Sequence, residues 1–161
     1  MERVFIGLGG NQGDSLGILR QAVVQIHGLP NTSVVAASSY YQSPAWGGVE
    51  QTDFLNAVLE LRTQYTPEEL LEQLLNIERQ HGRNRALEQH WGPRRLDCDI
   101  LLFGQRVLHS ESLTIPHPRM VARAFVLVPL AEIDVSLPVP GLGRVQSLLN
   151  DLPAYTIRLI E

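Results

Sequence analysis

Two carboxylates two residues apart, Asp97 and Asp99, are the side chains of this sequence best suited to bind a metal ion. Apolar residues alternate with them, namely Leu96, Cys98, Ile100 and Leu102. This two-residue period predicts a β-strand with one buried face, whose other face carries both acids. At a rise of about 3.3 Å per residue, the two acidic Cα atoms would lie roughly 6.6 Å apart, with their side chains pointing the same way. The spacing therefore offers a pair of hard oxygen ligands on a rigid element.

The same spacing also fits two solvated acids on the outer face of an antiparallel strand. Two unit charges about 6 Å apart repel by under 1 kcal/mol in water but by nearly 3 kcal/mol at an effective dielectric of about 20, so the pair is costly only in a cleft. The loop before this strand indicates that the two acids lie in a cleft and not on a solvated face, because it combines arginines with an aromatic residue and a Gly-Pro hinge. These residues are Arg83, Arg85, Arg94, Arg95, Trp91, Gly92 and Pro93. Mg²⁺ takes few carboxylates and fills its other positions with phosphate oxygens and water, while arginine binds phosphate bidentately. The stretch therefore indicates a site for Mg²⁺ and a polyphosphate.

Composition narrows the class of protein. The chain has 161 residues, of which 44% are hydrophobic, and we expect residues 1–161 to form a single domain. The net charge of −4 argues against a nucleic-acid or membrane-surface binder, which would need a basic surface. All thirteen Lys-plus-Arg positions are arginine, which excludes a Walker-type phosphate loop because that loop needs its lysine. The single cysteine excludes an internal disulfide, and no signal peptide or membrane-spanning run is visible, so we expect a cytoplasmic protein.

The elements that must position these groups follow from hydrophobic periodicity and helix signals. Asp14 or Ser15 is expected to cap a first helix that Gly28 ends, and Thr66-Pro67-Glu68-Glu69 is a capping box that opens a second helix. Residues 42–52 are expected to form a long loop. The predicted order is strand, helix, strand, strand, helix, strand, over residues 3–9, 16–27, 34–41, 54–61, 67–82 and 96–102.

This order predicts an α+β protein with the ferredoxin-like βαββαβ fold, in which an antiparallel sheet carries both helices on one face and the first strand lies between the third and the fourth. The face without these helices would then collect glycines, an aromatic ring, an amide and both acids from three strands: Gly7, Gly9, Phe54, Asn56, Asp97 and Asp99. Independent solvated faces would more often carry lysine, glutamate and threonine. The coincidence therefore favours a binding surface.

Short carboxy-terminal additions are expected after the fourth main strand. Residues 105–107 are predicted to form a short extra strand, and the Ile-Pro-His-Pro sequence should place His117 at a constrained turn. Arg119 and Arg123, four residues apart, are expected on one side of a short helix. Residues 135–161 should hold a short helix around 147–149 and a last strand near Ile157, with a packing role only.

Several motifs spread over nearly the whole chain carry a resemblance to a known family: Gly82-Arg83-Asn84-Arg85, Trp91-Gly92-Pro93-Arg94-Arg95-Leu96-Asp97-Cys98-Asp99-Ile100, Gly9-Gly10-Asn11, Ser43-Pro44, Phe54-Leu55-Asn56 and Ile115-Pro116-His117-Pro118-Arg119-Met120. They closely resemble the signature of the 6-hydroxymethyl-7,8-dihydropterin pyrophosphokinase family. The resemblance implies Mg²⁺-dependent transfer of pyrophosphate from ATP to the hydroxymethyl group of the pterin, giving AMP and the pterin diphosphate, in folate biosynthesis. We expect a monomer that binds neither nucleic acid nor membrane.

The resemblance also implies roles for individual residues, carried over by matching motif. The catalytic residues would be Arg83, Arg94, Asp97 and Asp99, and the two aspartates would hold two Mg²⁺ ions. The ATP site would be formed by Leu71, Glu78, Arg85, Trp91, Ile100, His117 and Arg123. The pterin site would be formed by Ser43, Pro44, Trp46, Phe54, Asn56 and Phe125, with the two phenylalanines stacked on the flat ring. The loops around Trp46 and Trp91 are expected to close over the site.

The sequence departs from the family pattern at three places. The loop from Arg83 to Trp91 is one residue longer than in compact bacterial members, and this extra residue affects the placement of Arg85 and Trp91 more than that of Arg94. Phe54 stands where tyrosine is common, and Gly10 where serine is common.

Alternatives remain at the sequence level. The resemblance places Glu78 in the ATP site, but an ordinary surface acid in the last helical turn is equally compatible with its position. A catalytically silent pterin- or nucleotide-binding paralogue is a second interpretation of the whole chain, and a ferredoxin-like RNA-binding module is a third, although the basic aromatic motif of that module is missing.

Overall fold

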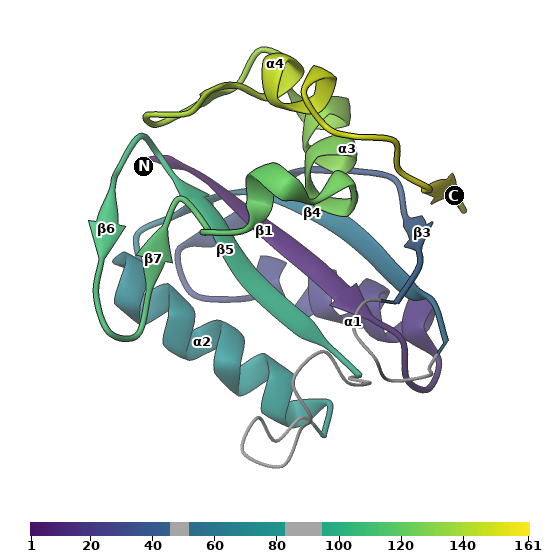
Figure 1. Cartoon of the computed structure of the whole chain (residues 1–161). Helices are drawn as coiled ribbons and strands as arrows, with labels where there is room; N and C mark the ends of the chain where they lie inside the picture. Colours follow the sequence, from purple (N-terminus) through teal and green to yellow (C-terminus); the bar gives the residue numbers. More distant parts are fainter. Residues whose placement is uncertain (46–51, 83–94) are drawn as a thin grey trace.

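The computed structural model of the protein describes residues 1–45, 52–82 and 95–161, which Figure 1 colours along the chain. Its first part comprises β1 (Arg3–Gly10), α1 (Ser15–His27), β2 (Thr32–Ala37), β3 (Tyr41–Ser43), β4 (Phe54–Thr63), α2 (Pro67–Gln80) and β5 (Asp97–Phe103). Its second part comprises β6 (Leu108–His109), β7 (Thr114–Ile115), the 3₁₀ helix η1 (Met120–Ala122), α3 (Ala124–Ile133), β8 (Pro138–Val139), β9 (Gly143–Arg144), α4 (Val145–Asn150) and β10 (Arg158–Leu159).

Helices α1 and α2 begin at the residues that the sequence indicated. The Asp14 side chain accepts a hydrogen bond from the Gly17 backbone N–H, and Gly28 caps the other end of α1. At the start of α2, the Thr66 hydroxyl accepts from the Glu69 N–H while the Glu69 carboxylate accepts from the Thr66 N–H, which completes the capping box. Both caps satisfy backbone donors that the first helical turn leaves without partners.

The main sheet has the strand order β10-β3-β4-β1-β5 with antiparallel pairing, and β2 also pairs with β4. The first strand therefore lies between the third and fourth predicted strands, and the ferredoxin-like prediction is confirmed. The predicted strand over 34–41 is wrong in one respect, because β2 ends at Ala37 and β3 begins at Tyr41. At the break, the Ser39 N–H donates to the Glu132 carboxylate of α3 at 3.0 Å instead of to a neighbouring strand.

The predicted loop over 42–52 also begins too early. Gln42 and Ser43 are the second and third residues of β3, where they pair with Leu55 and Phe54 of β4. The β3–β4 pair thus extends to the point at which Pro44 leaves the sheet.

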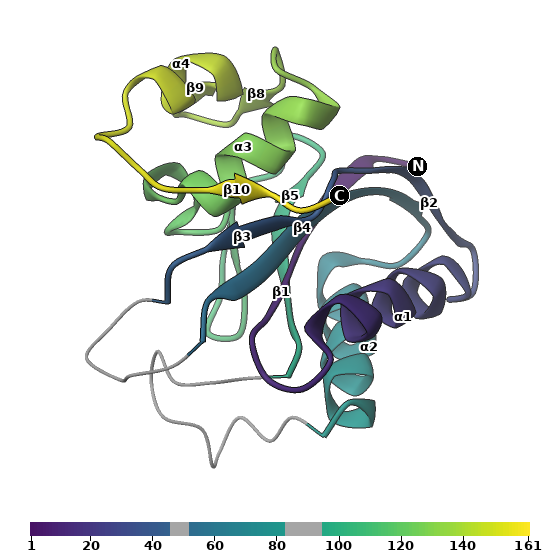
Figure 2. The ribbon, with the colours of Figure 1, turned by 90° about the vertical axis from the view of Figure 1, so that its right-hand side faces the viewer.

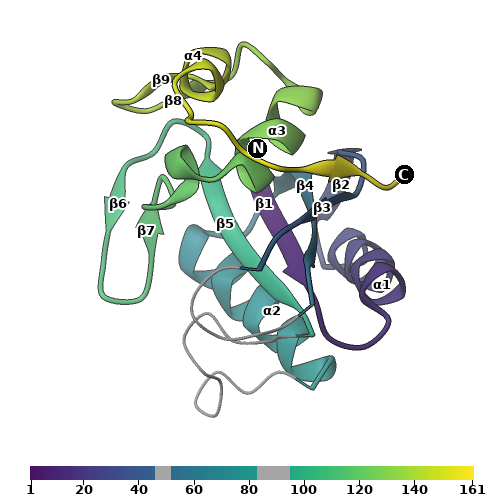
Figure 3. The same ribbon diagram turned by 45° about the vertical axis from the view of Figure 1, so that its right-hand side comes forward.

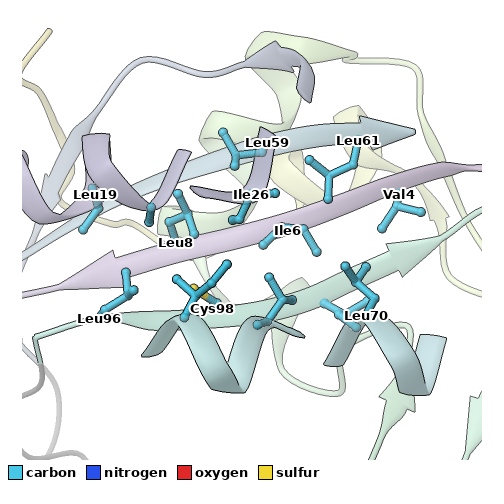
Figure 4. Close-up of a cluster of buried hydrophobic side chains, with 14 of the residues drawn as sticks. Val4, Ile6, Leu8, Leu19, Ile26, Leu59, Leu61, Leu70, Leu96 and Cys98 are labelled. Atoms are coloured by element: carbon cyan, nitrogen blue, oxygen red, sulfur yellow. The ribbon is translucent and has the colours of Figure 1, made fainter. Parts of the chain in front are cut away.

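Two hydrophobic clusters lie on opposite faces of the sheet. Figure 2 shows α1 and α2 on one side and α3 and α4 on the other. Figure 4 shows the larger cluster, between the sheet and the first two helices, with labelled side chains of Val4, Ile6, Leu8, Leu19, Ile26, Leu59, Leu61, Leu70, Leu96 and Cys98. The second cluster lies under α3 and includes Phe5, Val58, Leu101, Leu102, Met120, Val126 and Leu130. Helix α3 therefore covers part of the face that α1 and α2 leave open, while β5 starts at the end of the sheet away from α3 (Figure 1).

The predicted alternation along β5 fails at Leu102, which lies in the cluster under α3 instead of the cluster with Cys98 and Ile100. The cause is an irregularity in the β1–β5 register. Phe5 pairs with Leu102 while the next residue, Ile6, pairs with Ile100, so Leu101 is an extra residue on β5. Such a bulge reverses the alternation on one side of it. Both acids lie on the other side of the bulge and keep their predicted face.

The carboxy-terminal additions differ from prediction in two places. Residues 105–107 form no strand, because Gly104 turns the chain at a φ of +55°, and the extra strand is β6 instead. Arg119 and Arg123 do not share a helix, since they flank η1 at its two ends. The short helix and last strand expected near 147–149 and 157 are present as α4 and β10. Within the described ranges, no helix has the length and apolar character needed to cross a membrane.

Candidate functional site

A glycine on the central strand separates two of the predicted site residues. Gly9 of β1 is opposite Asn56 of β4 on one side and opposite Asp97 of β5 on the other. Directly opposed residues point to the same face of a sheet, and two strand spacings place the Asn56 and Asp97 Cα atoms roughly 10 Å apart. A Cβ atom at Gly9 would lie only 3.1 Å from Asn56 Oδ1. Glycine therefore leaves room for the amide side chain and keeps the space between amide and carboxylate open.

The two carboxylates are partly exposed on one face of β5, while Cys98 between them is buried. No group of three acidic, histidine or cysteine side chains with metal-site geometry occurs in the described ranges. Mg²⁺ needs no such cluster, because it keeps several water and phosphate ligands and takes only one or two carboxylates. The donor set of Asp97 and Asp99 therefore fits Mg²⁺ bound together with a polyphosphate.

His117 lies beside the carboxylates as a neutral ring. Burial lowers its pKa to about 4, Arg123 and Arg119 act in the same direction, and Asp97 opposes them. The Arg119 N–H donates to His117 Nδ1 at 3.3 Å, so the neutral ring carries its proton on Nε2. His117 Nε2 is 4.0 Å from Asp99 Oδ2, and this contact is therefore no ion pair near pH 7. The His117 N–H donates to the Leu101 carbonyl at 2.9 Å, which fixes the turn against β5.

Glu78 is a buried residue and not the surface acid that the sequence left open. It is only 1% exposed, and its Oε2 accepts a hydrogen bond from the Cys98 N–H at 2.7 Å. Ile100, also assigned to the ATP site, is 2% exposed and packs in the larger cluster, and Leu71 packs against the same cluster. The side chains of Glu78, from α2, and Ile100, from β5, thus lie on the helix-covered side of the strand that carries the acids.

Three of the residues predicted to bind the pterin, Ser43, Phe54 and Asn56, lie on the paired strands β3 and β4. The buried Asn56 Nδ2 donates to the Ser43 hydroxyl at 2.7 Å, and Phe54 is opposite Ser43 in the strand register. The Arg123 guanidinium lies 5.3 Å from the centroid of the Phe125 ring, so an expected ATP residue contacts an expected pterin residue.

A pocket of about 420 Å³ lies beside these residues. Its lining comprises Ser43, Pro44, Ala45, Ala122, Ala124, Phe125, Leu152, Pro153, Ala154, Tyr155 and Thr156. Phe54 and Asn56 do not line it. The sequence predicts only a packing role for residues 152–156, because an apolar stretch with one tyrosine has the same pattern whether it fills a core or borders a pocket.

Two hydrogen bonds that the sequence did not indicate join Asn11 to Thr52. The Asn11 side-chain amide donates to the Thr52 carbonyl at 2.8 Å, and the Thr52 hydroxyl donates to the Asn11 carbonyl at 2.6 Å. The turn after β1 is thereby fixed to the residues before β4. Five predicted site residues lie outside the described ranges, together with the loops expected to close over the site: Trp46, Arg83, Arg85, Trp91 and Arg94.

Comparisons with known proteins agree with the motif resemblance. The model of the family described as 7,8-dihydro-6-hydroxymethylpterin-pyrophosphokinase (HPPK) matches residues 5–135. A protein of Methylorubrum extorquens named 2-amino-4-hydroxy-6-hydroxymethyldihydropteridine pyrophosphokinase is 44% identical over 161 residues, which cover 100% of both chains. A Bacillus subtilis protein of the same name is 46% identical over 129 residues, covering 80% of this chain and 76% of the relative.

The fold of the chain is also similar to that of solved structures. The crystal structure of wild-type Plasmodium falciparum HPPK-DHPS with SDX-DHP matches with a TM-score of 0.68 and 13% identity over 93% of this chain. The present chain spans 43% of that longer chain. A triple mutant of the same protein with STZ-DHP matches with a TM-score of 0.71 over 92% of this chain and 42% of the longer one, at 12% identity. At such low identity the likeness supports the fold alone.

Proposed function

Because the chain belongs to the 7,8-dihydro-6-hydroxymethylpterin-pyrophosphokinase family, we infer that it transfers pyrophosphate from ATP to the hydroxymethyl group of 6-hydroxymethyl-7,8-dihydropterin, in folate biosynthesis. The products are AMP and the pterin diphosphate. The observation at the site that supports this best is the shared sheet face of Asp97, Gly9 and Asn56. It presents an acid for the phosphate side and an amide for the ring side, with no side chain between them at Gly9.

The chemistry is a single displacement. The pterin hydroxyl oxygen forms a bond to the β-phosphorus of ATP, and the bond from that phosphorus to the α,β-bridging oxygen breaks. AMP leaves with the bridging oxygen and its electron pair, and the hydroxyl proton passes to solvent. Phosphoryl-type transfer depends mostly on positioning and on neutralising charge, so the protein needs no nucleophile of its own.

On the phosphate side, we propose that Asp97 and Asp99 hold two Mg²⁺ ions. When bound, Mg²⁺ supplies charge neutralisation along the triphosphate and activation of the pterin hydroxyl. Arg83 and Arg94 are proposed to bind the transferring group, since guanidinium groups match phosphate oxygens bidentately. The remaining residues proposed for ATP are Leu71, Glu78, Arg85, Trp91, Ile100, His117 and Arg123. A neutral His117 can donate its Nε2–H to an oxygen without adding charge.

On the ring side, Phe54 and Phe125 are proposed to stack on the pterin, and Ser43, Pro44 and Trp46 to border it. The Ser43 hydroxyl already accepts from Asn56 Nδ2, which aims Asn56 Oδ1 toward Gly9. That oxygen is therefore oriented to accept a hydrogen bond from a ring N–H. A flat bicyclic ring has such donors at its edge and two faces suited to aromatic stacking.

We further propose that residues 1–161 form one pyrophosphokinase domain that acts as a monomer in the cytoplasm, without nucleic-acid or membrane partners. The net charge of −4 supports the absence of a nucleic-acid or membrane-surface partner. The single cysteine, Cys98, is buried and has no second cysteine in the chain for a disulfide, which suits a reducing compartment.

A ³¹P NMR time course with ATP, Mg²⁺ and 6-hydroxymethyl-7,8-dihydropterin tests the function directly. AMP and a pterin diphosphate should appear together, and a sample without pterin should produce neither. ADP as the product would mean a simple kinase. No reaction, with pterin binding retained, would mean a silent pterin-binding paralogue.

A further inference from the structure

The carboxy-terminal segment of the chain adds a strand to the main sheet next to β3. Arg158 and Leu159 of β10 pair with Gln42 and Tyr41. The pairing continues through the Ile160 N–H, which donates to the Tyr40 carbonyl at 2.8 Å. Figure 3 shows this segment, coloured yellow, running from α4 past α3 to the sheet.

This pairing changes the position of β3 in the sheet. β3 has only three residues, and its other neighbour is β4. Without β10 it would be a short edge strand, and short edges with few partners are among the parts of a fold that open most easily. Ser43 is the last residue of β3 and Pro44 follows it directly. The stability of β3 therefore governs how firmly these two residues are held.

The same carboxy-terminal segment borders the pocket next to Phe125. Residues 152–156 form one wall, and the other lining residues are Ser43, Pro44, Ala45, Ala122, Ala124 and Phe125. The segment thus borders the same pocket as both groups that are proposed to border the pterin, the Ser43-Pro44 pair at the end of β3 and the Phe125 ring from α3. It is well placed to fix the distance between them.

We propose that residues 152–161 are a positioning element for the pterin, holding Ser43 and Pro44 at a set distance from Phe125. The inference rests on the proposed function, since it assumes that these residues border the pterin. It predicts a selective effect: loosening the segment should weaken pterin binding while leaving ATP binding nearly unchanged, because Asp97, Asp99 and His117 are held by β1, β5 and the turn after β7.

The test uses Ile160→Pro, which removes the N–H that donates to the Tyr40 carbonyl, with Leu142→Ser as the control. Leu142 is 49% exposed and lies between β8 and β9, outside residues 152–161, so its change leaves the pairing of β10 intact. In Ile160→Pro, the KM for the pterin should rise roughly five-fold, as expected for one lost hydrogen bond with some local opening. The KM for ATP should change less than about two-fold, and Leu142→Ser should behave as the unmodified protein.

Three results would overturn the proposal: an unchanged pterin KM in folded Ile160→Pro, equal increases in both KM values, or the same effect in the control. If Ile160→Pro does not fold, Tyr155→Ala carries the test, because it alters the pocket wall and keeps β10. It too must raise the pterin KM selectively, and an unchanged value would contradict the proposal. Failure of the proposed function itself would be recognised separately, as absence of turnover in the unmodified protein.

Discussion

The Glu78 carboxylate accepts a hydrogen bond from the Cys98 N–H at 2.7 Å, and this joins the last turn of α2 to β5 midway between Asp97 and Asp99. Carboxylates are rarely buried unless hydrogen-bonded or paired, because removing the charge from water is costly. The position of this one, beneath the strand that presents both acids, indicates that it holds the strand in place. Its proposed contribution to the ATP site is then indirect, through the orientation of its neighbours on β5.

Glu78→Ala should lower the free energy of unfolding by about 1–3 kcal/mol, because it removes the acceptor of a buried backbone N–H. Glu72→Ala is the matched control, since Glu72 is exposed on the same helix and its loss should cost less than about 0.5 kcal/mol. Urea unfolding followed by circular dichroism measures both. Equal stability of the two variants would mean that the hydrogen bond to Cys98 contributes nothing to the fold.

Local signals in the sequence are sufficient to predict the main elements. The Thr66 capping box and the Asp14 cap fix where two helices begin, because each satisfies backbone donors with nearby side chains. The alternation along β4, with Leu59 and Leu61 on one face and Val58 on the other, also follows from the pattern alone. Since strand order in this fold class follows from element order, the sequence alone is enough to place Asp97 and Asn56 on one face of the sheet.

The remaining features depend on contacts between residues far apart in the sequence. The break before β3 requires Glu132 of α3 to accept from Ser39, and no pattern near residue 39 indicates this. The burial of Glu78 requires the Cys98 N–H as donor, so the helix sequence alone fits a surface acid equally well. The bulge at Leu101 arises from pairing with β1, and the apolar run that contains it gives no sign of the extra residue.

Asp97→Ala should separate folding from catalysis. The change removes one of two like charges on a crowded face, so the free energy of unfolding should change by about 1 kcal/mol or less. Turnover should fall on the order of 100-fold or more, as expected when a group that supports charge neutralisation is lost. Asp151→Ala, at an exposed position at the end of α4, is the control for losing one acid. Retained Mg²⁺-dependent turnover in Asp97→Ala would refute the proposed metal role.

Phe125→Ala tests the stacking proposal. Loss of the ring should raise the pterin KM roughly ten-fold, since an aromatic stack contributes about 0.5–1.5 kcal/mol beyond the area it buries. Phe125→Tyr keeps the stacking face and should restore a KM close to the original. Initial rates over a range of pterin concentrations at saturating ATP measure the effect. If the alanine variant kept the original pterin KM, Phe125 would not be a stacking residue.

The decrease in the free energy of unfolding at low pH should depend on Glu60 of β4, whose carboxylate lies between two arginines. Burial alone would raise the pKa of Glu60, but hydrogen bonds from Arg3 and Arg62 outweigh it and hold the pKa below the ordinary value of 4.5. The ionised form of Glu60 is thus more favoured over the protonated form in the folded chain than in the unfolded chain. Its contribution to stability is complete above about pH 4.5 and is lost as the pH falls below that value, because the unfolded chain takes up the proton first.

Glu60→Gln should therefore be less stable than the unmodified protein at pH 7 and should lose less stability on acidification below about pH 4.5. His117 contributes a separate loss between about pH 6.5 and pH 4, because its pKa is lowered to about 4 in the folded chain and the unfolded chain binds the proton earlier. That loss is common to both proteins, so the difference between their stability curves isolates Glu60. Urea unfolding at a series of pH values from about 3 to about 7 measures it, across the range in which both groups titrate. Parallel curves below about pH 4.5 would show that the Arg3–Glu60–Arg62 contacts do not stabilise the carboxylate in solution.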